Sequence, residues 1–453
     1  MGRTSLMMVI GFNVIFMTMG FNLSRYATDA YIKYSSYYQI EQAQYIAQSA
    51  TNIALSNLYT TNLANPGTVW SAPTGTITLA NGGTFTIVID STLLGGKDTI
   101  QVRMNATYAG IQAQTIVDYA RASFTDYAMY NVNENGIYWI TGDTCWGDLH
   151  TQDYLYVSGN PYFKGRVTTG KGLSKKNGAA DHPVFDGGYR SGVNQPLPGD
   201  VTDVKTLGRL TGASGGKDWV HSGTYPTPAL VEILFKGTGQ IYVTVTPQTG
   251  VNGSGNPILG TPVTTLYPNI TALSPNGVLL VENMPVRVKG VLNGNVTIGS
   301  VGTGSKVYID SSIAYSQNPK LPDGSPNPAC TSTLGIVAVN DVMVTDNTDN
   351  NNGVTIDASI FSLTGGFGAE NYTSRGIDGE LHLVGAIQAK DRNPVGTFSG
   401  SGTLASGFQK NYDYDTRLKD NPPAGYPKTA NFEVRNWYES ITKYPNIFDF
   451  LNP

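Results

Sequence analysis

The chain has 453 residues, with 29 basic and 33 acidic side chains and a net charge of −4. A charge so close to balance gives no basic surface for nucleic acid, so nucleic acid is not an expected partner. Only 14% of the residues are charged, whereas glycine reaches 53 and tyrosine 27. That composition is typical of β-rich proteins outside the cytoplasm, because turns need glycine and exposed strand faces favour tyrosine and threonine.

Residues 1–64 are predicted to form one long helix, hydrophobic first and amphipathic later. Residues 5–24 read SLMMVIGFNVIFMTMGFNLS and contain no charge, and neither glycine nor proline occurs between Gly20 and Pro66. Such an interval favours a continuous helix. In its second part the apolar positions recur mostly at spacings of three or four. This predicted stripe comprises Ala27, Tyr31, Tyr34, Tyr38, Tyr45, Ala50, Ile53, Ala54 and Leu58.

The apolar segment has three interpretations: a cleaved signal, a retained membrane anchor, or a helix that packs against copies of itself. Its length is enough to span a bilayer. No A-x-A-like site follows it cleanly and the helical pattern continues past it, which argues against cleavage. For an assembling helix we expect the large apolar side chains to make the contacts. They are Leu6, Met7, Val9, Ile10, Phe12, Val14, Ile15 and Phe16.

Residues 65–128 are predicted to form an antiparallel β-meander. The triplet NPG at 65–67 ends the helix, and the period of the pattern then changes from 3.6 to 2. One hairpin is expected to turn at Asn81-Gly82-Gly83 and a second near Ala109-Gly110.

A hydrophobic helix followed by such a meander resembles type IV pilin-like subunits, particularly the PilX-type minor pilins and related envelope proteins. The resemblance implies that the hydrophobic half of the helix lies in the inner membrane before assembly and in the filament core afterwards. It also implies that the amphipathic half packs on the small sheet. The family's processing site has a glycine, an apolar residue and a glutamate at the fifth mature position. Here Gly2 is followed by Arg3, and the fifth position counted from Arg3 is Met7.

Residues 129–410 alternate short β runs with turns rich in glycine, asparagine and aspartate, as in VRVKGVLNGNVTIG at 286–299. No fixed period is sharp, and irregular rungs of this kind predict a β-helix or solenoid-like domain, with long loops around 175–275. A β-sandwich is the alternative. Residues 411–453 are expected to be a tail that caps or docks the domain. The predicted fold class is therefore mainly β, with a long N-terminal hydrophobic α-helix.

Two motifs resemble catalytic loops in part. GRVTTGKG supplies Gly165, Gly170 and Lys171 of a phosphate-binding loop, but position 172 lacks the hydroxyl for magnesium and no helix is expected after it. GASGG places Ser214 in a nucleophile-like pattern with His221 nearby, but in a glycine-rich loop where no strand and helix flank it. We expect both to be structural loops.

A group of aspartates surrounds His150. Asp148 and His150 would share one face of a strand, with Asp143 and Asp153 approaching from turns. Such carboxylates form acid–base pairs in enzymes that act on polysaccharides. The alternative, which we expect, is that the aspartates accept turn N–H groups and His150 satisfies a buried neighbour.

No metal site is expected. The loop TDNTDNNNGVTID at 345–357 is rich in oxygen ligands, but it lacks the EF-hand spacing and is expected to be a solvated turn. Cys145 and Cys330 are 185 positions apart and have no metal-ligand spacing. They would either pair in an oxidising compartment or remain two isolated buried thiols.

Taken with the resemblance, these features predict a structural subunit of a bacterial type IV pilin-like surface filament, without enzymatic activity or a cofactor. Its expected partners are copies of itself and, before assembly, the inner membrane, with surface glycans as a further partner of the displayed domain. One alternative is a membrane-anchored polysaccharide-active or carbohydrate-binding β-helix protein, with carboxylates and aromatics in one groove. Another is a minor pilin at the filament tip that acts as an adhesin.

Overall fold

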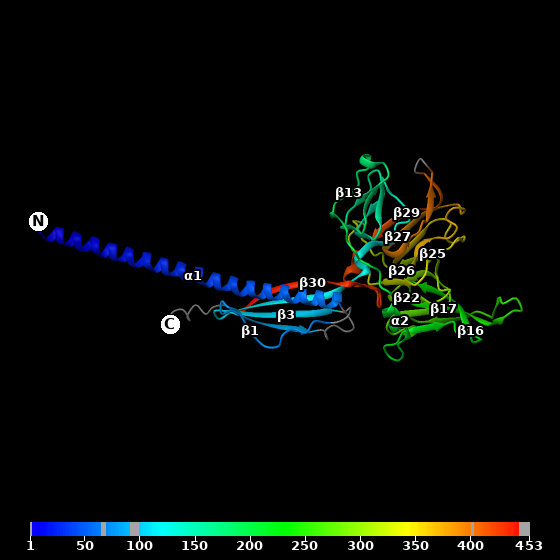
Figure 1. Cartoon of the computed structure of the whole chain (residues 1–453), viewed down its shortest axis with the longest axis horizontal. Coiled ribbons are helices and arrows are strands. Elements are labelled where there is room, and N and C mark those ends of the chain that lie inside the picture. Colours follow the sequence, from blue (N-terminus) through cyan, green and yellow to red (C-terminus); the bar gives the residue numbers. More distant parts are fainter. Residues whose placement is uncertain (1, 65–68, 91–98, 400–402, 444–453) are drawn as a thin grey trace. The chain divides into compact units, whose positions relative to one another are not determined.

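The computed structural model of the chain describes residues 2–64, 69–90, 99–399 and 403–443. They divide into two compact units, one formed by the residues up to Arg121 with those from Asn431 onward, the other by residues 122–430. The first unit consists of one helix and five strands (Figure 1). They are α1 (Gly2–Ala64), β1 (Ile77–Thr78), β2 (Thr84–Asp90), β3 (Thr99–Tyr108), β4 (Ile111–Ser123) and β30 (Lys428–Lys443).

The sheet of the first unit has the order β1-β2-β3-β4-β30, and both predicted hairpins are confirmed. The first turns through Gly82, with Thr78 opposite Thr84. The second turns through Ala109 and Gly110, which both have positive φ angles, as a tight two-residue hairpin requires. Strand β30 differs from the expectation for the tail, because it extends this sheet beside β4 and is not a cap of the second unit.

The second unit is built of many short strands. Its first part comprises η1 (Phe124–Asp126), β5 (Tyr127–Asn133), β6 (Trp139–Ile140), β7 (Thr144–Cys145), β8 (Asp148–Thr151), β9 (Tyr154–Ser158), β10 (Tyr162–Phe163), β11 (Val167–Thr169), β12 (Gly172–Lys175), η2 (Gly178–Ala180), β13 (Val184–Phe185) and β14 (Tyr189–Ser191). The middle comprises α2 (Thr202–Arg209), β15 (Lys217–Val220), β16 (Thr227–Lys236), β17 (Gln240–Val251), β18 (Pro257–Leu259), β19 (Val263–Tyr267), α3 (Ile270–Leu273), β20 (Val278–Glu282), β21 (Val286–Leu292), β22 (Asn295–Val301) and β23 (Val307–Tyr315). The last part comprises β24 (Thr333–Ala338), β25 (Val342–Val344), β26 (Val354–Ala369), β27 (Ile377–Arg392), β28 (Gly396–Phe398), β29 (Leu404–Tyr414) and η3 (Thr416–Lys419).

Most of these strands stack in parallel, so that successive turns of the chain lie on one another. One wall of the stack follows the order β15-β20-β22-β24-β26-β27-β5-β8-β11-β14, each strand parallel to the next. The region predicted as long loops departs from this pattern. Strands β16, β17 and β19 pair antiparallel there and form an arm.

The first turns of the stack have a regular length. Trp139 lies opposite Val157, Thr144 opposite Tyr162 and Leu149 opposite Val167, each pair separated by 18 positions. The offset grows to 22 in the next turn, where Val167 lies opposite Tyr189. The stack is therefore regular only locally, which is why no fixed period was detectable in the whole sequence.

The order of the wall shows that the chain enters the stack in its interior. Strand β5, the first strand of this unit in the sequence, lies between β8 and β27. The chain builds β8, β11 and β14 on one side, crosses to β15, and returns through β20, β22, β24 and β26 to β27. Two half-stacks thus meet at the β27–β5 ladder, which we call the seam.

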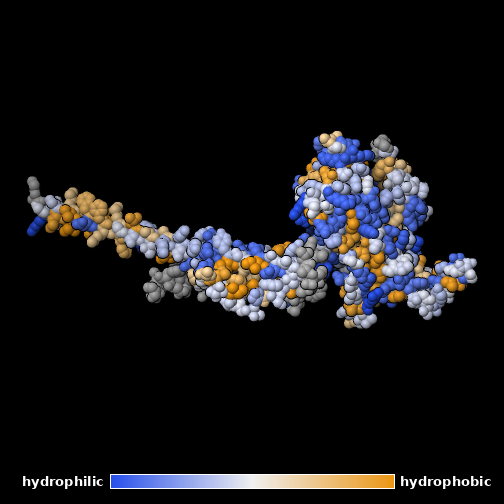
Figure 2. Space-filling view, in the orientation of Figure 1, coloured by the Kyte–Doolittle hydropathy of each residue, from blue (hydrophilic) through white to orange (hydrophobic). Residues whose placement is uncertain are grey.

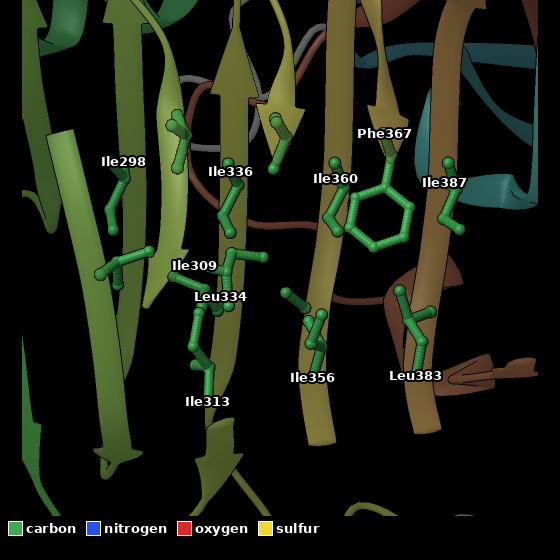
Figure 3. Packing of buried hydrophobic residues seen from close by; sticks show 14 of the residues in the cluster. Ile298, Ile309, Ile313, Leu334, Ile336, Ile356, Ile360, Phe367, Leu383 and Ile387 are labelled. Carbon is green, nitrogen blue, oxygen red and sulfur yellow. The ribbon is translucent and has the colours of Figure 1, made fainter. Parts of the chain in front are cut away.

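The core of the stack consists of rows of aliphatic side chains, in which each row runs across neighbouring parallel strands. Ile298, Ile336, Ile360 and Ile387 are register partners on neighbouring strands, and Figure 3 shows them side by side. The row continues across the seam to Met129. All of these side chains are buried, and full burial of each contributes about 1.5–3 kcal/mol. The predicted fold class, mainly β with a long N-terminal helix, an antiparallel meander and a large β domain, is confirmed.

Candidate assembly helix

The second half of α1 packs on the sheet of the first unit through a stripe of small residues. Its buried apolar positions recur mostly at spacings of three and four and are Ala43, Ile46, Ala47, Ala50, Ala54 and Leu58; the polar Thr51 is buried beside them. They contact a buried sheet face that includes Val102, Met104 and Ala106. Alanine suits this position because it favours the helix and lets the helix axis come close to the strands.

The stripe predicted from the sequence was therefore wrong in part. Ala50, Ala54 and Leu58 are buried as expected, but Tyr45 is 56% exposed and Ile53 is 58% exposed. Tyr31 and Tyr34 also lie exposed, and Tyr38 is 47% exposed although its ring contacts Tyr108 of β3. The alanines of AQYIAQSATNIAL were the signal that identifies the correct face.

The first half of α1 has no partner among the described residues. Figure 1 shows it extending past the end of the sheet, and Figure 2 shows hydrophobic residues gathered along it. The predicted assembly residues all lie on this half, with between 51% and 74% of each side chain exposed. They are Leu6, Met7, Val9, Ile10, Phe12, Val14, Ile15 and Phe16.

The polar residues of this half are compatible with an apolar environment. The Thr18 hydroxyl donates to the carbonyl oxygens of Val14 and Ile15, each at 2.9 Å. Such bonds satisfy the hydroxyl within the helix itself. By length and composition, α1 is a helix that could cross a membrane, and its most apolar stretch is entirely exposed.

The exposed half can therefore do one of two things: enter a bilayer or pack against other helices. In water its large apolar side chains would remain hydrated, at a cost of about 25 cal/mol for each Å² of apolar surface. A contiguous apolar surface of this extent marks a membrane or protein interface.

The other sequence candidates prove to be structural. His150 is fully buried on β8, its Nδ1 lies 2.7 Å from Thr168 Oγ1, and its ring stacks on Tyr130. Burial lowers the pKa of His150 to about 4. Asp143 accepts the Ile140 N–H at 3.0 Å and Asp148 accepts the Arg166 N–H at 3.0 Å. This is the alternative that we expected for the Asp/His group.

The phosphate-loop glycines lie where two turns of the stack touch. A Cβ on Gly165 would lie 2.2 Å from the carbonyl carbon of Gly147, and one on Gly170 would lie 2.3 Å from the Gln152 oxygen. Lys171 forms an ion pair with Asp153 at 2.8 Å. Ser214 lies in a loop, and His221 is engaged with the Pro228 carbonyl at 2.8 Å.

The Asp/Asn-rich loop at 345–357 is less solvated than expected. Asn350 is fully buried, and its amide donates to the carbonyl oxygens of Ile309 and Thr345 at 3.0 and 3.1 Å. The loop therefore ties two turns of the stack together. Within the described ranges, no group of three or more His, Cys, Asp or Glu side chains could hold a metal ion.

The two cysteines are free and buried. Cys145 lies on β7, and its Sγ is 3.5 Å from the Gly147 carbonyl oxygen. Burial raises the pKa of the Cys145 thiol to about 12 and also raises that of Cys330. Of the two arrangements left open by the sequence, the structure contains isolated thiols.

Comparisons with known proteins give little beyond this. No family model matches the sequence, and no curated protein matches it. Among solved structures, the chain is similar to the competence-associated pilin ComZ from Thermus thermophilus, with a TM-score of 0.34 and 13% identity. That similarity covers 88% of this chain and 97% of the pilin.

Proposed function

We propose that the chain is a structural subunit of a pilin-like surface filament. The observation that supports this most is the division of α1, whose second half packs on its own sheet while the large apolar side chains of its first half stay exposed. A rigid continuous helix with one docked half presents the other half to neighbours at a fixed angle. Copies of the chain would bury that surface against one another, and each large side chain buried would stabilise the assembly by about 1.5–3 kcal/mol.

In this proposal the first half of α1 lies in the inner membrane before assembly and in the filament core afterwards. The β-rich second unit is displayed at the cell surface, and the subunit performs no covalent chemistry and needs no cofactor. The competing function is a plain membrane anchor, in which each chain remains alone in the lipid. The two differ in whether chains contact one another through the helix.

The test is a charge in the apolar half of the helix. Val14→Asp places a carboxylate where neighbouring helices would pack, and a buried unpaired charge is costly. We expect the variant to yield at least tenfold fewer filaments in the sheared surface fraction, counted by negative-stain microscopy. Val14→Leu keeps the site apolar and is the matched control, with a yield close to the wild type.

Membrane fractionation separates loss of assembly from loss of insertion. Ile10→Asp lies nearer the end of the apolar segment, where a charge disturbs insertion less. We expect it to remain in the membrane fraction while filaments are lost. Two results would contradict the proposal. One is a wild-type yield of filaments from both aspartate variants, and the other is that cells making the wild-type chain form no filaments. Mass spectrometry of the same filaments identifies their N-terminus.

A further inference from the structure

The meeting of the two half-stacks leaves a groove beside the seam. Among the described residues, β6 and β7 form no ladder with the other half, because β6-β9-β12 and β7-β10-β13 are separate sheets. The groove has a volume of about 920 Å³. It is lined from one half by β6, β7 and their connecting turn, and from the other by β28, β29 and the end of β27. Its size is that of a site for a medium-sized ligand.

Aromatic side chains form much of its wall. Trp146 is 47% exposed, and the Lys164 ammonium lies 5.2 Å from the centre of its ring. Tyr138 and Tyr412 are half-buried, and Trp139 is buried. A tryptophan held open to solvent beside other rings offers a flat apolar surface with polar edges.

The charges of the groove cancel. Its acidic lining residues are Asp143, Asp391 and Asp413, and its basic ones are Lys176, Arg392 and Lys410, three of each sign. Several are matched directly: Lys410 Nζ lies 3.6 Å from Asp143 Oδ2, and Arg392 Nη1 lies 2.8 Å from Glu134 Oε2 behind the wall. An ionic ligand would have to compete with these pairs.

The carboxylates of the groove already accept hydrogen bonds or form ion pairs within the protein. Asp143 accepts the Ile140 N–H at 3.0 Å, and Asp391 accepts the Asn133 amide at 2.7 Å. Asp413 forms an ion pair with Lys320. Carboxylates held in this way position a ligand but do not serve as a free acid–base pair for hydrolysis.

The groove still offers unused hydrogen-bonding capacity. The Lys410 ammonium has three donors, and its carboxylate partner lies beyond the distance of a strong bond. Asn393 and Gln409 add amides to the same lining. These donors favour an occupant that is rich in hydrogen-bond acceptors.

We propose that the seam groove binds a neutral oligosaccharide. A sugar ring has an apolar C–H face that stacks on an aromatic ring and hydroxyl edges that both donate and accept hydrogen bonds. Those are the surfaces and groups that this groove presents, and the balanced charge favours an uncharged chain. This binding function goes beyond the filament proposal and does not depend on it.

The test is oligosaccharide binding by the full chain in a detergent that carries no sugar headgroup. The probes are cellohexaose, maltohexaose and chitohexaose, with hexagalacturonate as the acidic counterpart. Isothermal titration measures affinity, and tryptophan fluorescence reports contact, because two of the five tryptophans line the groove. We expect saturable binding of at least one neutral hexasaccharide, and weaker binding of hexagalacturonate.

Trp146→Ala is expected to weaken that binding at least tenfold, because it removes the exposed stacking surface. Tyr154→Ala is the matched control: Tyr154 is 43% exposed, lies under Lys171 and is not part of the groove lining. It should bind like the wild type. Absence of binding by every neutral probe, equal affinity in Trp146→Ala, or tighter binding of hexagalacturonate than of all neutral probes would overturn the inference. Filament yield is a separate measurement, so none of these outcomes bears on the filament proposal.

Discussion

Ile387 on β27 and Met129 on β5 are direct register partners in one parallel ladder, although 258 positions separate them in the sequence. Both side chains are buried, at 5% and 7% exposure, and they join the aliphatic rows of the two half-stacks. Within the second unit, this contact joins the half-stack that comes first in the sequence to the half-stack that comes last.

Ile387→Ala should destabilise the second unit by about 2–5 kcal/mol, because a large side chain is removed from a packed row. The measurement is unfolding of the full chain in denaturant. The control is Ile377→Ala on the same strand, where the side chain is 64% exposed. That change should fall within about 0.5 kcal/mol of the wild type. Equal effects of the two substitutions would contradict the role assigned to the seam.

Gly165→Ala should destabilise the chain strongly, because its Cβ would lie 2.2 Å from the backbone of the preceding turn. A backbone atom cannot give way without moving a whole turn of the stack, so the loss should be about 1–3 kcal/mol or more. Gly199→Ala is the control, since a Cβ there meets nothing within 4 Å. Thermal unfolding of the two variants compares them directly, and a stable Gly165→Ala protein would refute the close approach.

Acid should weaken the fold through His150. Burial lowers the pKa of this side chain from 6.5 to about 4, so the unfolded chain binds the proton more tightly than the folded chain. The stabilisation is complete above pH 6.5 and is lost as the pH falls toward 4, amounting to about 3 kcal/mol.

The matching measurement is unfolding at several pH values for the wild type and His150→Asn. The variant should lose less stability than the wild type between pH 6.5 and 4. Comparing the two removes the opposing contribution of Asp218 and Asp357, whose pKa values burial raises to about 6. Identical pH profiles would show that His150 is not held neutral by burial.

Both thiols should resist alkylation in the folded chain. Because burial raises the pKa of Cys145 and of Cys330, the reactive thiolate is rare at pH 8 and reagents reach it poorly. Mass spectrometry after iodoacetamide treatment should find neither cysteine modified in the native protein and both modified after unfolding. A peptide cross-linked through Cys145 and Cys330 in the unreduced protein would contradict this.

Local chemistry made the first unit predictable. The absence of charge, glycine and proline correctly predicted the helix. The two glycine-containing turns correctly predicted the hairpins, and each of these signals depends only on residues close together in the sequence. The helix face was predicted less well, since Tyr45 and Ile53 fit a helical period as well as the alanines do. Only contact with the sheet decides between such faces.

The seam and its groove were beyond prediction for a different reason. The pairing of β27 with β5 depends on a contact between distant residues that leaves no local pattern. Lys410 comes from the other half-stack than Trp139 and Trp146, and all three line the groove. The sequence did contain one regular signal of the stack. Gly147 and Gly165 lie 18 positions apart, and 18 residues is the length of the first turn.

The position of β5 inside the stack also sets an order of events during synthesis. Within the second unit, strands β5 to β14 leave the ribosome first, yet one edge of β5 stays unpaired until β27 is made, more than 240 residues later. Until then a parallel edge with unpaired N–H and C=O groups is open to pairing with another chain. Pairing between strands so far apart in the sequence slows folding. A chain that terminates before β27 would keep the unpaired edge of β5 and would therefore be prone to aggregate.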